Sequence, residues 1–501
     1  MGELIGNLGH GFAVAFSLEN LAFCLAGALM GTLVGVLPGL GPVATIAILL
    51  PVTFSLDPTG ALIMLAGIYY GAQYGGSITA ILLNLPGEAS SVVTTLDGHA
   101  LARKGRAGEA LMVAAVGSFV AGSFAALLIA VAAPPLSQVA QAFQPADYFS
   151  LMLLGLVLAT VLAHGSVLKG VAMTLIGVFL GLVGMDVTSG ALRYTLGIPD
   201  LADGVGFVPL AMGLFGIAEI ARNLERGGAK RERLAAGVSR LSMGWRAWRR
   251  AIPSILRGTG VGSLLGVLPG GGAVMGAFAA YLLEKRIARD PARFGNGAIE
   301  GVAAPESANN AGAQTAFIPM LTLGIPGNAV TALMIGALTI HGITPGPRVM
   351  TENADLFWGL VVSMWLGNLM LLVINLPMVR LWVRLLDVPY RFLFPAIVLF
   401  CCIGAYSVDN AAFDVALTAF FGVAGYFLMR YGFEPAPLVL GFVLGPAMEE
   451  YLRRALLLSR GDAIVFVEQP LSLIFLFVAA SMLALALVPR FAGLRQGSAE
   501  E

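Results

Sequence analysis

Charged residues are scarce in this chain. Only 12% of its 501 residues are Asp, Glu, Lys or Arg, about half the share of a soluble globular protein, whereas 58% are hydrophobic. So few charges cannot cover a soluble body of this size. Such high hydrophobicity also excludes disorder, despite 64 glycines and 26 prolines. The composition therefore predicts a polytopic membrane protein. Because 29 basic residues balance 29 acidic ones, no basic field attracts nucleic acid, and we expect the lipid bilayer as a partner instead.

Motifs for catalysis and metal binding are also missing. The three cysteines lie in apolar stretches without a disulfide framework, and the four histidines show no zinc-ligand spacing. No lysine completes a Gly-x-x-x-x-Gly-Lys-Ser/Thr phosphate loop, and no Gly-x-Ser-x-Gly elbow occurs. These absences exclude ATP hydrolysis by this chain and argue against an enzyme, so we expect neither catalysis nor a cofactor. The N-terminus lacks a basic region and a cleavage site, so we expect no removable signal peptide.

Long apolar segments fill most of the chain, and a membrane-spanning helix needs about 20 such residues. Windows that qualify predict spans near 17–36, 60–83, 110–133, 148–164, 170–186, 205–224, 298–323, 356–379, 392–408, 412–429 and 471–489. Other apolar stretches carry internal Pro-Gly punctuation and look too short or too broken to span simply: 36–54, 252–283, 324–342 and 434–447. We expect an all-α fold of about 10–12 transmembrane helices with interrupted, re-entrant hairpins.

Basic residues gather in three segments. Residues 222–257 hold ten, 97–109 hold three and 285–293 hold four, whereas 51–58 and 134–147 hold none. Since Lys and Arg stay on the cytoplasmic side of a membrane, the three basic segments are placed in the cytoplasm.

Three short elements of the first half recur in order in the second. They are 35–41 and 266–272 (GVLPGLG, GVLPGGG), 71–73 and 312–314 (GAQ), and 83–89 and 323–329 (LNLPGEA, LGIPGNA). Collinear matches favour duplication over coincidence. The loop after the first element has no basic residue in the first half and four in the second, so matching loops face opposite sides of the membrane. This pattern predicts two inverted-topology repeats, as in many secondary transporters.

The repeats also indicate where a ligand binds. In such transporters, paired segments broken by Gly and Pro place half-helix ends near the bilayer midplane, where irregular backbone is tolerated only inside protein or beside a watery cavity. Here the pairs are 35–45 with 266–276, and 71–91 with 306–329. We expect these four segments to form the binding site together.

Polar residues inside these segments are the candidates for chemistry. Ionisable and amide side chains at membrane depth are costly and usually functional, which favours a role for the group 306–310 (ESANN). A single Ser or Thr is as well explained by helix–helix hydrogen bonding, and for Glu88 both alternatives stay open. We expect no basic residue inside the spans. An anion would then rest on helix N-termini and neutral donors, with a cation beside it.

The strings GVLPGLGP, YYGAQYGGSITAILLNLPGE and AAPESANNA, followed by LTLGIPG and HGITPGP, resemble a known family over about residues 20–450. The chain is similar to the large membrane subunit of the tripartite tricarboxylate transporters. The resemblance implies a multi-pass permease of the bacterial inner membrane with an elevator-like fold. It implies a small membrane subunit of about four spans and a periplasmic substrate-binding protein as partners. It also implies import of citrate or other organic carboxylates, driven by a Na⁺ or H⁺ gradient; homo-oligomerisation stays open.

The resemblance and the repeats together give the expected binding residues. They are Pro38, Gly39, Gly41, Gly76, Ser77, Asn84, Pro86, Gly87, Glu88, Pro269, Gly270, Gly272, Glu306, Asn309, Asn310, Gln314, Pro326 and Gly327. Expected Na⁺ ligands within this set are Asn84, Glu306, Asn309 and Asn310. One departure from the family's pattern concerns Gln314 and Thr315, where small glycines are usual, so the pocket and its preference for citrate are open to change.

The expected organisation has five parts. These are an N-terminal amphipathic segment (1–16), a first repeat (17–224), a cytoplasmic basic linker (225–251), a second repeat (252–450) and a C-terminal extension with the last span (451–501). A passive channel and an intramembrane enzyme are the alternatives to a gradient-driven permease. Duplicated interrupted helices fit alternating access better than a static pore.

Overall fold

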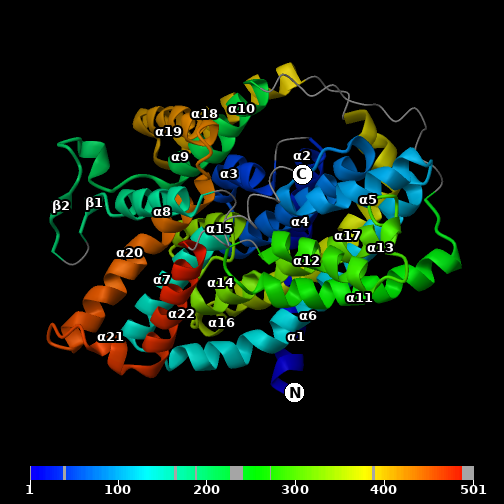
Figure 1. Cartoon of the computed structure of the whole chain (residues 1–501). Coiled ribbons are helices and arrows are strands. Elements are labelled where there is room, and N and C mark those ends of the chain that lie inside the picture. Colours follow the sequence, from blue (N-terminus) through cyan, green and yellow to red (C-terminus); the bar gives the residue numbers. More distant parts are fainter. Residues whose placement is uncertain are drawn as a thin grey trace.

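The computed structural model describes residues 2–37, 41–162, 166–186, 189–225, 241–270, 272–385 and 390–487. These residues are almost entirely helical, as the composition predicts. The departure from an all-α fold is one small hairpin, in which β1 (Gly184–Met185) pairs antiparallel with β2 (Leu192–Arg193). The hairpin projects from the left edge of the molecule in Figure 1.

The helical elements follow one another with short connections. Those up to residue 225 are α1 (Gly2–Ala15), α2 (Leu18–Gly35), α3 (Pro42–Thr53), α4 (Pro58–Leu83), η1 (Ala89–Ser91), α5 (Val92–Arg103), α6 (Ala107–Gln141), α7 (Pro145–Leu162), α8 (Val167–Gly181), η2 (Pro199–Leu201), α9 (Phe207–Ala211), η3 (Met212–Ile217) and α10 (Ala218–Glu225). The later ones are α11 (Trp245–Gly266), α12 (Gly272–Ile287), η4 (Pro291–Arg293), α13 (Glu300–Thr315), α14 (Phe317–Leu323), α15 (Ala329–Ile340), α16 (Val349–Glu352), α17 (Ala354–Leu385), α18 (Tyr390–Asp409), α19 (Ala412–Arg430), α20 (Pro435–Leu458), α21 (Val465–Glu468) and α22 (Pro470–Leu487).

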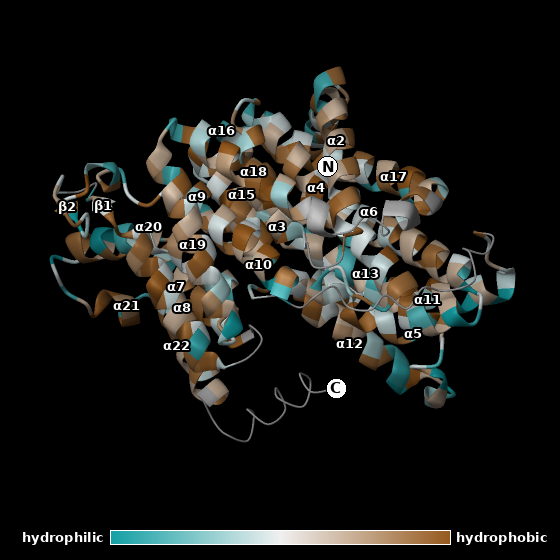
Figure 2. Cartoon of the chain, turned by 90° about the horizontal axis from the view of Figure 1, so that it is seen from above, coloured by the Kyte–Doolittle hydropathy of each residue, from teal (hydrophilic) through white to brown (hydrophobic). Residues whose placement is uncertain are grey.

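Several helical segments are suited to a membrane. Among the described residues, five are long and apolar enough to cross one: Leu18–Gly35, Ala107–Gln141, Phe207–Glu225, Ala354–Val379 and Ala412–Arg430. Six further apolar helices have 10–17 residues: Pro42–Thr53, Pro145–Val161, Val167–Gly181, Ala329–Ile340, Phe394–Asp409 and Pro470–Ala486. The hydropathy colouring of Figure 2 shows apolar ribbon over most of the helices. The expected number of crossings stays a prediction.

Several helix boundaries differ from the sequence-based expectation, and two of the differences concern prolines. The span expected over 298–323 breaks at Ala316, because Pro319 has no N–H to bond the carbonyl of Thr315. The stretch 434–447 is not broken: α20 runs through it, with Pro435 and Pro437 in the first turn, where a helix tolerates them, and Pro446 inside the helix. The loop expected at 134–147 is largely helical, because α6 continues to Gln141. The predicted linker (225–251) ends inside α11, and its residues 226–240 lie outside the described part.

Glycines at every fourth position bring helices into backbone contact. Such spacing lets membrane helices approach closely. A Cβ built on Gly31 of α2 would lie 2.2 Å from the carbonyl oxygen of Ile68 on α4. A Cβ on Gly262 of α11 would lie 2.2 Å from that of Ala308 on α13. The pairs α2–α4 and α11–α13 are therefore built in the same way.

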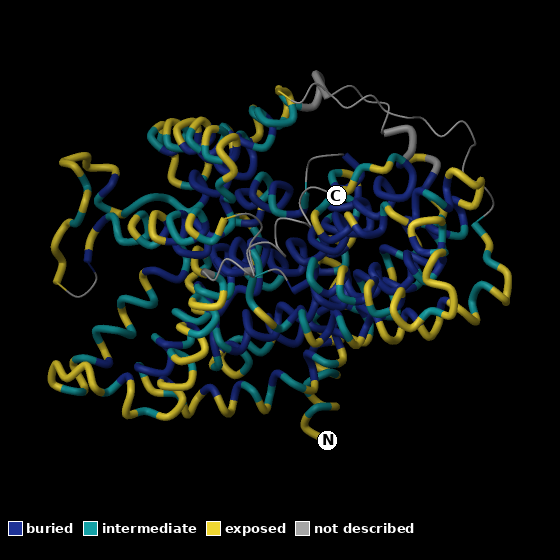
Figure 3. The backbone as a smooth tube through the Cα atoms, in the orientation of Figure 1, coloured by how far each residue is buried: buried dark blue, intermediate teal, exposed yellow. Residues whose placement is uncertain are grey.

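Two groups of helices are visible from both directions. In Figures 1 and 2, α5, α11, α12, α13 and α17 lie on one side and α7, α8, α20, α21 and α22 on the other, while α6 runs from the first group toward the second. Figure 3 shows the most continuous burial within the first group. Helix α13 is polar, yet it is buried from Gly301 to Thr315, so its Glu and Asn side chains face protein rather than lipid. Helix α4 is buried from Gly60 to Leu82.

Candidate functional site

The two Leu/Ile-Pro-Gly elements have the same local structure. Helix α4 ends at Asn84 (φ 57°) and α14 ends at Gly324 (φ 71°), both in the left-handed conformation that closes a helix. After each Pro-Gly pair the chain enters a new helix through a capping box. Glu88 exchanges hydrogen bonds with Ser91 in the first element, and Asn328 does so with Thr331 in the second. Each element is therefore a helix end followed directly by a helix start.

Both elements line one cavity of about 830 Å³. Pro86, Gly87 and Glu88 face it from the first element and Asn328 from the second. Gly270 lines it as well, and its N–H donates to the carbonyl oxygen of Gly327 at 2.8 Å. This hydrogen bond joins the two broken segments of the second half at the cavity wall.

Helix N-termini surround this cavity. The residues that begin five helices are among those lining it: Gly41 and Pro42 of α3, Glu88 and Ala89 of η1, Ala273 in the first turn of α12, Asn328 and Ala329 of α15, and Glu434 and Pro435 of α20. The first N–H groups of a helix have no partner within it, and the helix dipole is positive at that end. The wall is therefore suited to negatively charged groups.

Charged side chains also line the cavity. Three are carboxylates, Glu88, Glu219 and Glu434, and one is the guanidinium of Arg222. The expectation that no basic residue stands inside the spans is wrong in this respect, because Arg222 belongs to the apolar segment Phe207–Glu225. Of the described residues that line the cavity, an anion would meet one arginine and the helix ends, together with three carboxylates, of which Glu219 and Glu434 have interaction partners.

A second layer of polar residues lies behind the cavity. Glu306 of α13 is fully buried and accepts hydrogen bonds from Ser77 of α4 and Thr94 of α5. Its neighbour Asn309 donates to Oε1 of Glu88 at 3.0 Å. Asn310 donates to Oγ of Ser118 at 2.6 Å. The Asn309–Glu88 hydrogen bond thus connects the cavity to this buried polar core.

The expected site residues divide among these layers. Gly41, Pro86, Gly87, Glu88 and Gly270 line the cavity. The buried polar core contains Ser77, Glu306, Asn309, Asn310 and Gln314. The others form the surrounding backbone: Gly76, Asn84, Pro269, Gly272, Pro326 and Gly327. Pro38 and Gly39 lie outside the described residues.

The expected Na⁺ group is brought together only in part. Glu306, Asn309 and Asn310 share one helix, whereas Asn84 is an exposed residue at the end of α4. Within the described residues no hydrogen bond joins Asn84 to the other three. The sequence analysis left several cavity residues out of the site: Tyr69, Glu219, Arg222 and Glu434. Gln73 and Asn328 also line the cavity, and both lie in the paired segments expected to form the site.

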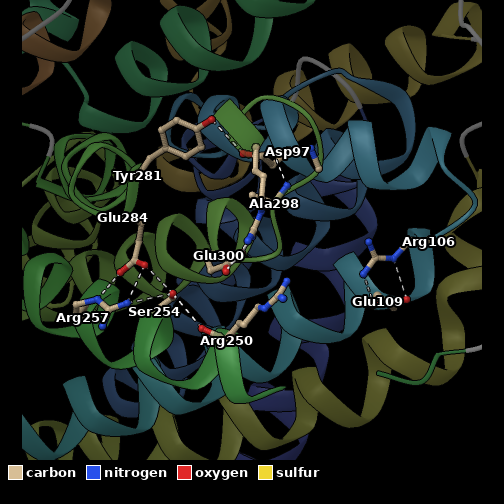
Figure 4. Close-up of polar contacts among 12 residues, drawn as sticks. Asp97, Arg106, Glu109, Arg250, Ser254, Arg257, Tyr281, Glu284, Ala298 and Glu300 are labelled. Carbon is tan, nitrogen blue, oxygen red and sulfur yellow. Dashed lines mark hydrogen bonds and ion pairs between the residues drawn. The ribbon is translucent and has the colours of Figure 1, made fainter. Parts of the chain in front are cut away.

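A buried carboxylate holds the start of α13 in place, as Figure 4 shows. Oδ1 of Asp97 accepts from the backbone N–H groups of Gly297 and Ala298, each at 2.7 Å, and Oδ2 accepts from the hydroxyl of Tyr281 at 3.0 Å. Nearby, Nζ of Lys104 donates to the carbonyl oxygen of Asn296 at 2.5 Å. These contacts join the basic segment 97–109 to residues on either side of 285–293, the other basic segment expected on the same side of the membrane.

We expect Asp97→Ala to destabilise the protein by roughly 3 kcal/mol or more, because each buried donor left without a partner costs about 1–3 kcal/mol. Thermal unfolding of the purified protein in detergent measures this effect. Asp290→Ala is a matched control, since Asp290 precedes the short η4 with an exposed side chain and makes no side-chain cap there. Equal stability of the Asp97 and Asp290 variants would contradict the role given to Asp97.

The fold and the site define a class of protein: a multi-pass helical membrane protein whose interrupted helices surround an internal cavity. Residues 21–440 match the tripartite tricarboxylate transporter TctA family, and the chain belongs to this family of membrane transporter components. This confirms the family indicated by the sequence motifs.

Two relatives come from Agrobacterium vitis. An uncharacterized 52.8 kDa protein of the TAR-I ttuC′ 3′ region is 54% identical over 492 residues, which cover 98% of this chain and 97% of the relative. An uncharacterized protein of the TAR-II ttuC′ 3′ region is 60% identical over 227 residues, which cover 45% of this chain and 91% of the relative. No solved structure matches the chain.

Proposed function

We propose that this chain is the large permease subunit of a binding-protein-dependent secondary transporter. It imports tricarboxylates or related organic anions by alternating access, driven by a Na⁺ or H⁺ gradient. The observation that carries the proposal is the cavity of about 830 Å³, lined by Pro86, Gly87 and Asn328 of both interrupted elements. Cavities between broken helices are the usual substrate sites of secondary transporters.

The chemistry of the wall supports an anionic substrate. Helix N-termini offer unpaired N–H groups and positive dipole ends, and Arg222 adds a positive charge. The carboxylate of Glu88 would repel an anion that entered alone. Movement of the anion together with Na⁺ or H⁺ removes this conflict, which favours symport over passive flow.

The local structures support the inverted duplication. The capping boxes at Glu88 and Asn328 correspond, as do the left-handed helix ends at Asn84 and Gly324. The packing also refines the sequence match: Gly35 of α2 lies against Ala72, and Gly266 of α11 lies against Gly312. Ala72, rather than Gly71, is therefore the structural counterpart of Gly312. We propose that these two halves move the cavity across the membrane in an elevator-like step.

The remaining parts of the proposal concern assembly and place. Membership of the TctA family implies other subunits, and we propose a small membrane subunit of about four spans and a periplasmic binding protein that delivers the carboxylate. We place the complex in the bacterial inner membrane.

The test is uptake of labelled di- and tricarboxylates into proteoliposomes that contain this chain and its small subunit. Uptake is measured with and without the binding protein, under an imposed Na⁺ or H⁺ gradient. We expect accumulation above equilibrium that requires the gradient and the binding protein, and the effective gradient names the ion. Equilibration without a gradient would indicate a passive channel instead. Failure to move any carboxylate would overturn the substrate class.

A further inference from the structure

A column of buried amides lies between α13, α6 and α17, away from the cavity. Asn310, Gln314 and Asn368 are fully buried, and Asn375 is 3% exposed. Among the described residues, no hydrogen-bond partner is found for Oδ1 of Asn310, either amide atom of Gln314, either amide atom of Asn368, or Oδ1 of Asn375. Native interiors leave few polar atoms unpaired, and each unpaired atom is costly. So many in one place indicate a bound ligand.

Gly122 of α6 shows where these amides converge. A Cβ built on this residue would lie 2.5 Å from Nε2 of Gln314, and 2.6 and 2.7 Å from Nδ2 and Oδ1 of Asn368. The two amides therefore face one point beside α6. A half-turn of either amide exchanges its nitrogen and oxygen, so two amide oxygens can face that point.

The column continues one helical turn along α6 and α13. Ser118 precedes Gly122 by four residues, and its Oγ accepts from Nδ2 of Asn310, which precedes Gln314 by four residues. Ser118 and Asn375 also line a small space of about 20 Å³, room for about one water molecule. A further turn along α13, the carbonyl oxygen of Glu306 accepts from Asn310 at 3.2 Å. The column therefore ends at the backbone of Glu306, whose side chain accepts hydrogen bonds from Ser77 and Thr94 instead.

We propose that Gln314 and Asn368 bind one dehydrated Na⁺ ion beside Gly122, and that Asn310, one turn earlier on α13, extends this column of neutral amides. Neutral oxygen ligands suit a monovalent ion, whereas Ca²⁺ and Mg²⁺ usually require direct carboxylate ligands, and none of these three side chains is one. The site differs from the sequence-based group of Na⁺ ligands, because it includes Gln314 and Asn368 and leaves out Asn84, Glu306 and Asn309. As the binding site of a coupling ion, this inference rests on the proposed function; as a cation site, it is testable without transport.

The test compares thermal unfolding of the detergent-purified protein in NaCl and in choline chloride at equal ionic strength. Na⁺ that binds the folded state alone should raise the midpoint by several degrees, in a saturable manner. We expect the rise to disappear in Asn368→Leu and Gln314→Met, which are close in size to the native residues. In choline these variants should be at least as stable as the native protein, because each removes unpaired buried polar atoms.

A second pair of variants keeps the test independent of amide replacement. Gly122→Ala places a methyl group where the amides converge and should also abolish the Na⁺ response. Gly260→Ala is the matched control, because a Cβ at that position of α11 meets no atom within 4 Å, and its response should match that of the native protein.

Two outcomes would overturn the site. One is a native protein whose unfolding midpoint is the same in NaCl and in choline chloride, and the other is a full rise of the midpoint with Na⁺ in Asn368→Leu and Gly122→Ala. The proposed function fails separately. A protein that responds to Na⁺ in the expected way but moves no carboxylate would keep the site and lose the substrate class. Gradient-driven uptake, together with an unchanged rise of the unfolding midpoint with Na⁺ in the variants, would support the proposed function and contradict the proposed site.

Discussion

Gradient-driven uptake should fall at least tenfold when Glu306 is replaced by glutamine, while the protein still inserts into the membrane. Glu306 is fully buried and accepts hydrogen bonds from Ser77 and Thr94, which come from two different helices. Glutamine keeps the shape but has one acceptor oxygen, and its amide group faces a hydroxyl group. A hydrogen bond to a charged group contributes about 1.5–3 kcal/mol, and one between neutral groups about 0.5–1.5 kcal/mol. Since about 1.4 kcal/mol corresponds to a factor of ten in an equilibrium constant, weakening these hydrogen bonds accounts for a tenfold loss of uptake.

The measurement is initial uptake of a labelled carboxylate per amount of inserted protein, under the gradient that drives the native complex. Glu300→Gln is the matched control. Glu300 begins the same helix and pairs with the half-exposed Arg293 at 2.8 Å, outside the polar core. We expect near-native uptake from this control, since partly exposed ion pairs contribute about 1 kcal/mol or less. Native uptake by Glu306→Gln would remove Glu306 from the transport mechanism.

Local sequence signals predicted much of the fold, because they act over a few residues. Pro-Gly punctuation marks the helix breaks near Gly87 and Gly327, and low charge with long apolar runs marks the membrane protein. The prediction was wrong at 434–447, where Pro435 and Pro437 stand in the first turn of α20 and Pro446 lies inside the helix without ending it. Whether a proline breaks a helix depends on its position in that helix, which the local sequence does not give.

The site could be predicted only where the two halves repeat each other. Gly87 and Glu88 were found through the repeated motif, whereas Arg222 and Glu434 reach the cavity by long-range packing that no local pattern reveals. Asn368 was missed because it is one amide within an apolar helix. Its importance follows only from the neighbouring Gln314 and Gly122. By contrast, the contact of α2 with α4 could have been predicted from their glycines, which are spaced by four residues.

Gly87→Ala should reduce uptake to background, the largest effect expected from adding a single methyl group. A Cβ at Gly87 would lie 2.3 Å from Cα of Gly76 and 2.9 Å from the carbonyl oxygen of Gly35. Both neighbours are backbone and cannot move aside as a flexible side chain can, so the Pro-Gly element must shift out of the cavity wall. Overpacking of this kind costs roughly 1–3 kcal/mol or more.

A shifted element and an unfolded protein are distinguished by measuring thermal unfolding beside uptake. We expect Gly87→Ala to insert and unfold cooperatively at a somewhat lower temperature, with carboxylate accumulation at background. Gly260→Ala adds the same methyl group to α11 with no atom of another residue within 4 Å of it. This control should keep full uptake and lose no stability, because alanine favours a helix over glycine by about 1 kcal/mol. Since Gly87 separates the cavity from the α2–α4 contact, native accumulation by Gly87→Ala would mean that the first Pro-Gly element does not form the substrate site.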